Sequence, residues 1–261
     1  MATDPRTHIS NHLLATKSLP VGQLWLSQFL SSQRAATTPL SALTQTALFR
    51  LLASDFTTSL EITNPSQALP TNIPDPAVKE RLISGPIPLQ VLDIEDIGSS
   101  LWSQVESIEK IERGEETRGR EIIRTVTRDE SGDVATAGYN NNNNTNNTPN
   151  ILGTNSSNAR NISSSTTGSG GPHRLVLQDA KGTRVIAIEY KPVEEVGIGK
   201  MSIGAKLVVK NATVARGILL LEPDCVNVLG GKIEGLDKAW RDGRKARLLE
   251  RLAEQAAAEA T

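Results

Sequence analysis

The chain has 261 residues, of which 38% are hydrophobic, and its 28 basic and 29 acidic residues leave a formal net charge of −1. This length accommodates one or two domains, and the balanced charge excludes the global basic field that drives non-specific nucleic-acid binding. Cys225 is the only cysteine, which excludes an internal disulfide and a cysteine-based zinc site within one chain.

The first 63 residues are predicted to form a helical head. Apolar residues at helical spacing indicate helices over 21–33 and 39–52, with a shorter element after Asp55. We expect Trp25 and Phe29, which are four residues apart on one helix face, to lie in the core. The predicted buried stripe of the second helix consists of Leu43, Leu48, Phe49 and Leu52.

Residues 64–85 are predicted to form a linker, because their four prolines between 65 and 76 interrupt regular structure. The spacing of apolar residues then changes from helical to strand-like. A first strand is expected around Leu89–Ile97, followed by a helical or extended tail over Ser100–Ile111.

Residues 113–172 are dominated by small and polar residues, including asparagines at 140–144. Such a segment buries too little apolar surface to offset its conformational entropy, so we predict a long disordered insertion. Between Arg118 and Arg128, cations alternate with β-branched residues, which suits folding on a partner but also suits a solvated charge run. The candidate partner-binding residues in this segment are Arg118, Arg120, Ile122, Ile123, Arg124 and Val126.

Alternation of apolar and polar residues returns at His173 and predicts a hairpin over 173–190. Strands are also expected at 206–211, 217–221 and 226–229, before a C-terminal helix over 233–261. The predicted fold class is α+β: an N-terminal helical bundle, a five-stranded OB-fold (oligonucleotide/oligosaccharide-binding) β-barrel with a long disordered insertion, and a C-terminal helix. The barrel is assigned to residues 86–112 and 173–232. Strand number alone does not separate an OB barrel from an SH3-like barrel.

Three segments carry a resemblance to a known family: Gly204–Val209 (GAKLVV), Arg216–Pro223 (RGILLLEP) and Val226–Gly231 (VNVLGG). They closely resemble the N-terminal OB-fold domain of the RecQ-mediated genome instability protein 1 family, an accessory subunit of topoisomerase III. The resemblance extends to Arg174–Asp179, Ile188–Pro192, Leu89–Val91 and the helix with Trp25–Leu26.

The resemblance implies a nuclear, non-catalytic scaffold subunit whose partners are topoisomerase III and a RecQ-family helicase. Such complexes dissolve double Holliday junctions and serve DNA repair, recombination and replication, and DNA is engaged mainly through the complex. In the family, a loop between the first two barrel strands reaches into the topoisomerase gate and tunes its opening; residues 113–172 occupy that position. Animal members continue into a second OB domain, so we expect its functions to be absent here.

Two alternative functions remain open. One is an OB-fold module that binds single-stranded or junction DNA directly, which normally requires aromatic side chains that stack on bases, each worth about 1–3 kcal/mol. Between His173 and Gly231, Tyr190 is the only Phe, Tyr or Trp residue. The other is an adaptor without effect on the gate.

The barrel itself offers two candidate partner-binding residues, Lys206 and Lys210. They lie on one side of their predicted strand and are expected to face outward.

Nothing in the sequence predicts catalysis, a cofactor or a metal. His8 and His12 lie in an N-terminus that we expect to fray, and His173 borders the insertion, so no triad or ligand set emerges. We expect no small-molecule substrate and, because no run of about 18 apolar residues occurs, no membrane span.

In the final helix, the basic run Arg241–Arg251 is expected to be a solvated face. The residues of this helix expected to pack on the barrel or head are Leu236, Trp240, Leu248 and Leu252.

Overall fold

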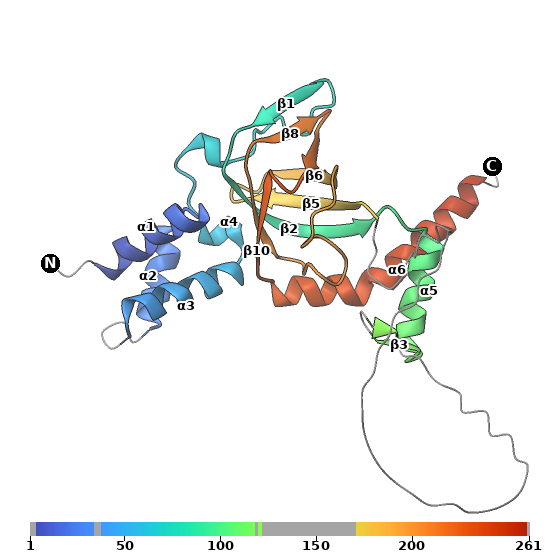
Figure 1. Cartoon of the computed structure of the whole chain (residues 1–261), viewed down its shortest axis with the longest axis horizontal. Coiled ribbons are helices and arrows are strands. Elements are labelled where there is room, and N and C mark those ends of the chain that lie inside the picture. Colours follow the sequence, from blue (N-terminus) through green and yellow to red (C-terminus); the bar gives the residue numbers. More distant parts are fainter. Residues whose placement is uncertain (1–3, 34–37, 118–119, 122–170, 260–261) are drawn as a thin grey trace, which may run out of the picture.

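The computed structural model describes residues 4–33, 38–117, 120–121 and 171–259. Its N-terminal head contains α1 (Pro5–Lys17), α2 (Gln23–Ser31), α3 (Leu40–Leu52) and the single turn α4 (Phe56–Ser59), placed at one end of the molecule (Figure 1). The helices enclose a core of their own, formed by Ile9, Leu13, Leu19, Val21, Leu26, Phe29, Leu43, Ala47, Leu51, Phe56 and Leu60.

The expectation that the N-terminus frays is wrong. Residues 5–17 form α1, which starts at Pro5 and is capped by the Asp4 carboxylate, whose Oδ1 accepts from the Arg6 amide at 3.4 Å. Ile9 and Leu13, one helical turn apart, are fully buried in the head core. Two apolar residues at this spacing form only a weak helical pattern in the sequence, and the packing of α1 on α3 stabilises the helix.

The buried face of α3 also differs from the predicted stripe. Leu43, Ala47 and Leu51 recur every four residues and are buried, whereas the side chain of Phe49 is 74% exposed. Leu48 and Leu52 lie at the margin of the head core. The Trp25 and Phe29 rings stack with centroids 5.5 Å apart, with Phe29 buried and Trp25 packed at the edge of that core.

Residues 64–85 are more than a linker. After the short 3₁₀ helix η1 (Pro65–Gln67), the chain forms β1 (Glu80–Ile83), which pairs antiparallel with β8. Leu69, Ile73 and Ile83 contribute to the core of the sheet. The prolines interrupt regular structure up to Pro76, but four residues of extended chain beyond them suffice to add a strand at the edge.

Within the described residues, the sheet contains eight strands and not the five predicted for the barrel; β1 and β8 lie on segments that were not predicted as strands. The others are β2 (Ile87–Asp96), β5 (His173–Asp179), β6 (Arg184–Glu189), β7 (Lys206–Val209), β9 (Ile218–Leu221) and β10 (Val226–Gly230), and β8 spans Ala212–Ala215. Their order is β1-β8-β9-β6-β5-β2-β7-β10, and β6 pairs parallel with β9 whereas the other pairs are antiparallel.

The sheet curls around an apolar core because the long strand β2 pairs with β5 along most of its length and with β7 near its start. A bulge between Val91 and Asp93 bends β2 between these partners. This is the OB-fold architecture expected from the sequence. Among the described residues, no backbone pairing joins the two outer strands, β1 and β10, so the curled sheet keeps two edges.

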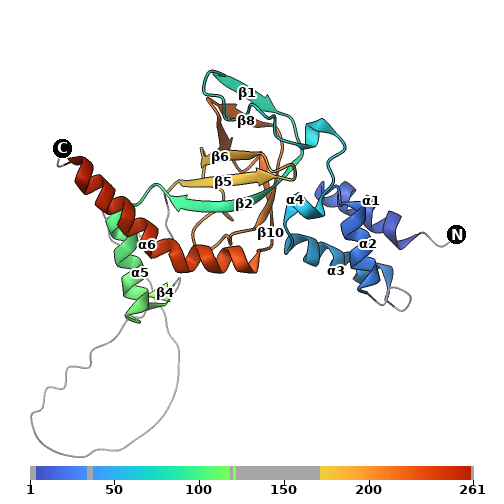
Figure 2. The ribbon, with the colours of Figure 1, turned by 180° about the vertical axis from the view of Figure 1, so that it is seen from behind.

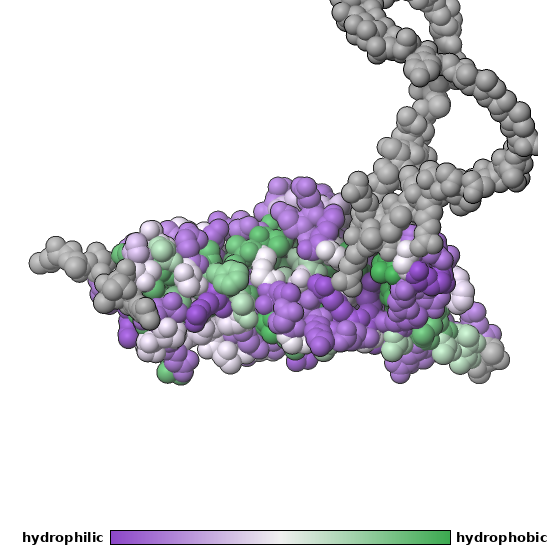
Figure 3. Space-filling model, turned by 90° about the horizontal axis from the view of Figure 1, so that it is seen from below, coloured by the Kyte–Doolittle hydropathy of each residue, from purple (hydrophilic) through white to green (hydrophobic). Residues whose placement is uncertain are grey.

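The connection from β2 to β5 contains α5 (Leu101–Glu112) and two short paired strands, β3 (Glu116–Thr117) and β4 (Arg120–Glu121). The predicted disorder of residues 113–172 falls mostly outside the described residues. α6 (Glu234–Glu259) is continuous through Gly243, runs beneath the sheet and meets α5 (Figure 2). The surface on the side of the molecule where α6 lies, seen from below, is largely hydrophilic (Figure 3).

Of the four residues of α6 predicted to pack, Leu248 is buried, Trp240 packs against the sheet core and Leu252 is half-buried, whereas Leu236 is 42% exposed. Within the described ranges, the longest apolar stretch of any helix is insufficient to cross a membrane.

The contrast between two neighbouring residues of α3 provides a test of the head core. Leu51→Ala should lower the free energy of unfolding by about 2–5 kcal/mol, because it leaves a cavity between packed helices. Phe49→Ala should change it by less than about 0.5 kcal/mol, because the ring is mostly in solvent. Urea denaturation followed by circular dichroism measures both, and a larger effect of Phe49→Ala would contradict the assignment of the buried face.

Candidate functional site

The base of the insertion is a fixed turn at the end of β2. Asp96 directs it: its Oδ1 accepts from the amides of Gly98 and Ser99 at 2.8 and 3.0 Å. Gly98 lies so close to Gly171 that a Cβ on either residue would fall within 2.5 Å of the other's Cα. The two ends of the connection from β2 to β5, which includes α5 and the insertion, therefore leave the sheet side by side.

α5 is anchored to this turn by Gln104, which is buried. Its Nε2 donates to the carbonyls of Asp96 and Ser99 at 3.0 and 3.1 Å, and its Oε1 accepts from Arg244 of α6 at 3.2 Å. Ser100 caps the helix by accepting from the Ser103 amide at 3.1 Å. One amide side chain thus joins the turn, α5 and α6.

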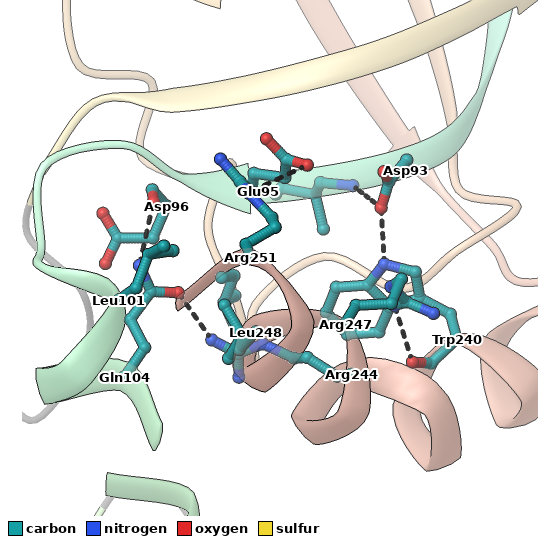
Figure 4. Close-up of a pocket in the computed structure, with 12 residues that line it drawn as sticks. Asp93, Glu95, Asp96, Leu101, Gln104, Trp240, Arg244, Arg247, Leu248 and Arg251 are labelled. Atoms are coloured by element: carbon teal, nitrogen blue, oxygen red, sulfur yellow. Dashed lines mark hydrogen bonds and ion pairs between the residues drawn. The ribbon is translucent and has the colours of Figure 1, made fainter. Parts of the chain in front are cut away.

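A small hollow of about 70 Å³ lies where β2, α5 and α6 converge (Figure 4). On its floor, the Trp240 indole N–H donates to Asp93 Oδ1 at 2.6 Å, and Leu248 closes the side facing α5. Three carboxylates and three guanidinium groups line it, so their charges largely neutralise one another. They belong to Asp93, Glu95, Asp96, Arg244, Arg247 and Arg251.

Ion pairs continue from the hollow along α6. Glu95 pairs with Arg251 through one oxygen and with Arg174 through the other, both at 3.3 Å. Lys245 Nζ lies 2.7 Å from Glu112 and 3.4 Å from Glu109, both on α5. The hydrogen bond to Glu112 raises the pKa of Lys245. The basic run of α6, expected to be a solvated face, instead holds α5 and β2.

The far end of the insertion is held by His173, which is buried. Glu189 Oε2 accepts from the His173 amide at 2.8 Å and lies 2.5 Å from its Nδ1, while Glu189 Oε1 accepts from the Val193 amide at 3.0 Å. This histidine borders the insertion, as predicted, and fixes the start of β5.

The prediction that Lys206 faces outward is wrong. Its side chain is 0% exposed and lies between the head and the sheet, with Nζ 2.6 Å from the Gly204 carbonyl and 4.8 Å from the centroid of the Phe56 ring. Every residue of β7 is buried: Leu207 and Val209 belong to the sheet core, and Phe56 of the head lies against Lys206. Lys210, just past the strand, is exposed and lies apart from Lys206.

Gln90 connects the same parts with four hydrogen bonds. Its Oε1 accepts from the Phe56 amide at 3.0 Å and from Lys206 at 3.3 Å, and its Nε2 donates to Asp55 at 3.0 Å and Gln178 at 3.1 Å. The amide therefore has no unsatisfied group despite complete burial. A glutamine within an apolar strand is the one sequence signal that marks this junction, and Gln90 was not among the predicted site residues.

Two pKa values are shifted at the head–sheet junction. Burial lowers the pKa of Lys206 to about 8, although the Asp55 carboxylate acts in the opposite direction. Burial acts to raise the pKa of Asp55, but hydrogen bonds from Thr57 and Gln90 and the charge of Lys206 outweigh it and leave the pKa below its ordinary value.

Most predicted partner-binding residues of the insertion, namely Arg118, Ile122, Ile123, Arg124 and Val126, lie outside the described residues. The backbone of Arg120 forms part of β4, which pairs with β3. Their role in binding stays a prediction. Over the described ranges, no group of three His, Cys, Asp or Glu residues is arranged to hold a metal ion.

These features define a class of protein: an OB-fold module with a helical head, whose charged side chains organise the exit of an insertion. Family models agree with this class. The model of the RMI1 N-terminal OB-fold domain matches residues 69–244, and that of the RMI1 N-terminal helical domain matches residues 13–59. The chain belongs to the RecQ-mediated genome instability protein 1 family.

Individual relatives carry the same name. The chain is 31% identical over 152 residues to RecQ-mediated genome instability protein 1 of Schizosaccharomyces pombe, a match that covers 58% of each chain. It is 44% identical over 64 residues to the Xenopus laevis protein and 39% identical over 56 residues to the Arabidopsis thaliana protein. These matches cover 11% and 8% of the frog and plant proteins, so the chain corresponds to a part of each.

Burial of Lys206 predicts a pH-dependent stability. Because its pKa is about 8 in the folded chain and 10.5 ordinarily, the unfolded chain binds more protons between these pH values, and this residue makes the free energy of unfolding rise with pH. From pH 7 to pH 10, the native chain should gain about 2 kcal/mol relative to Lys206→Met. Urea midpoints at both pH values measure the difference. Lys210→Met is the matched control and should follow the native chain; equal behaviour of the two variants would contradict a buried cation.

The pairing of α5 with α6 provides a second test. Lys245→Glu places a third carboxylate beside Glu109 and Glu112, so hydrogen exchange of the α5 amides should accelerate several-fold, while the urea midpoint of the whole chain changes little because the pairs lie at the surface. Lys238→Glu, an exposed substitution on the same helix, should leave α5 unchanged. Adding Glu109→Lys and Glu112→Lys to Lys245→Glu should restore protection; failure of this rescue would show that the charge pairs do not hold α5.

Proposed function

We propose that the chain is a non-catalytic scaffold subunit of a nuclear complex of a RecQ-family helicase and topoisomerase III. In this role it promotes decatenation and dissolution of double Holliday junctions, and thereby genome stability. Family membership over both the head and the OB fold carries the proposal. The sheet and the insertion engage topoisomerase III, and the helicase joins through the assembled complex.

The mechanism that we propose is a shift between two states of the topoisomerase gate. An insertion that binds one gate state more tightly than the other changes the time that the gate stays open, whereas equal affinity for both states changes nothing. The geometry at the base supports this mechanism. Asp96, Gln104 and the ion pairs of Lys245 fix where the insertion leaves the sheet, so a segment that contacts a partner would be delivered in a defined direction.

Direct binding of single-stranded DNA is the second candidate. Tyr190 of the sheet region is 65% exposed and offers one ring for stacking on a base. Trp240, by contrast, is engaged by Asp93 and by packing on the sheet. Two further exposed rings, those of Phe49 on α3 and Trp102 on α5, lie on helices and not in the sheet region. With one exposed ring in the described sheet region, we expect weak binding by the isolated chain. Submicromolar, strongly salt-dependent binding of an oligothymidylate in an anisotropy titration would favour this candidate instead.

The proposed function predicts the effect of removing the insertion but not its base. In the variant, a linker of about ten glycine and serine residues replaces residues 122–170, which leaves α5, β3, β4 and the glycine pair at the exit in place. The variant should retain its melting temperature and still co-purify with topoisomerase III, while decatenation or junction dissolution changes several-fold.

Full co-purification with unchanged topoisomerase turnover would identify an adaptor and reject gate modulation. If neither the native chain nor the variant co-purifies with topoisomerase III, the scaffold role is rejected. A linker of the same length with reversed sequence serves as the control for linker effects.

A further inference from the structure

β10 is an edge strand with peptide groups directed away from the sheet. It pairs only with β7, where Asn227 faces Val208. The Lys210 amide donates to the Cys225 carbonyl at 2.8 Å, so hydrogen-bonded positions fall at Cys225 and Asn227. The N–H and C=O groups of Val226 and Val228 therefore point to the open side, and no backbone hydrogen bond joins them to another segment of the described chain.

The open side of β10 faces a hollow of about 360 Å³, a volume that accommodates several side chains. The segment 192–195 forms the opposite wall, and Pro223 and residues 226–228 form the rest. Glu194 and Glu195 are exposed there, and within the part of the chain that is described neither carboxylate has an ion-pair partner. The lining thus combines free peptide groups with two carboxylates and no cation.

The rest of the molecule holds β10 in place while leaving this edge uncovered. The side chains of Val226 and Val228 pack against the sheet core, and Leu229 packs against the core of the head. Beyond the strand, Gly231 approaches the Leu52 carbonyl of α3 so closely that a Cβ would lie 2.5 Å from that oxygen. The strand is therefore fixed at its end by the head, and its edge needs no rearrangement to accept another strand.

We propose that the open edge of β10 is a docking site for an extended segment of a partner protein that carries Lys or Arg at alternate positions. The segment adds as a further strand of the sheet, with main-chain hydrogen bonds to Val226 and Val228. Because side chains of a strand alternate, every second residue of the segment faces the hollow, where Glu194 and Glu195 favour a cation. This site is distinct from the insertion and does not depend on the proposed function.

The test uses the full chain and a fluorescein-labelled octapeptide of alternating lysine and valine. Anisotropy should reveal saturable binding that weakens as salt is added. An octapeptide of alternating glutamate and valine should bind at least tenfold more weakly, because its charge is reversed. Two further lysine–valine peptides carry N-methyl groups on every second amide, one on the odd-numbered and the other on the even-numbered residues. The peptide whose methyl groups replace the N–H groups that face β10 should lose binding, because it cannot pair with the edge.

Variants of the chain separate edge pairing from general charge attraction. Glu194→Lys with Glu195→Lys should weaken binding about tenfold, whereas Glu250→Lys with Glu254→Lys, an equal charge change on exposed positions of α6, should not. Val228→Pro removes one outward N–H and leaves the bonds to β7, so it should also abolish binding. A thermal melt of each variant verifies folding, and the charge variants carry the test if Val228→Pro does not fold.

Several outcomes would overturn the proposal. No binding by the native chain at millimolar peptide is one, and equal weakening by the two double charge variants is another. Undiminished binding of the N-methylated peptides would show that the main chain plays no part. Binding that occurs only after residues 122–170 are replaced by a linker would mean that this chain itself occupies the edge.

Discussion

The amide of Gln90 is the interaction on which the arrangement of head and sheet depends. It is buried inside β2, where an unsatisfied donor or acceptor costs about 1–3 kcal/mol, and each of its four bonds leads to a different residue. Two of these residues, Asp55 and Phe56, begin α4, and the other two, Gln178 and Lys206, lie on the strands that flank β2. A displacement of the head therefore removes two of the four partners of the amide, Asp55 and Phe56, and uncovers the Lys206 cation, which ties the head to the sheet more specifically than apolar contact does.

A second polar network fixes the opposite end of the sheet, where Asp96 and Gln104 turn the chain from β2 into α5. The helical head and the base of the insertion are thus held by separate groups at separate ends of one long strand. For the proposed scaffold role, this division has a clear use. A partner bound at the insertion and a partner bound near the head meet surfaces whose relative positions are set by β2 and α6.

Much of this fold follows from local sequence patterns. The alternation in 173–190 predicts strands because every second residue there faces the core. The apolar runs at 207–209 and 218–221 also predict strands: all of the first run is buried, and Leu219 and Leu221 are buried in the second. β1 and β8 were missed because each has only four residues and lacks the apolar run that marks the equally short β7 and β9. α1 was missed because its buried face consists of Ile9 and Leu13 alone.

Side-chain roles were harder to predict than strands. A lysine in an otherwise apolar strand looks solvated unless the surface that covers it is known, and for Lys206 that surface is Phe56, 150 positions earlier in the chain. The basic run of α6 likewise acquires its role only from the carboxylates of α5 and β2. Such pairings arise from the tertiary arrangement, which no local pattern encodes.

α6 has a further consequence as a mechanical element. Its 26 residues form a rod about 39 Å long, which begins where β10 leaves the head and continues past α5. Because successive residues of a helix are rotated by about 100°, a single residue inserted between Trp240 and Leu248 would swing Leu248 and Arg251 away from β2 while Trp240 kept its place. Deletions or insertions of one residue in this stretch should therefore be far more disruptive than substitutions, and lengths that preserve whole turns should be tolerated best.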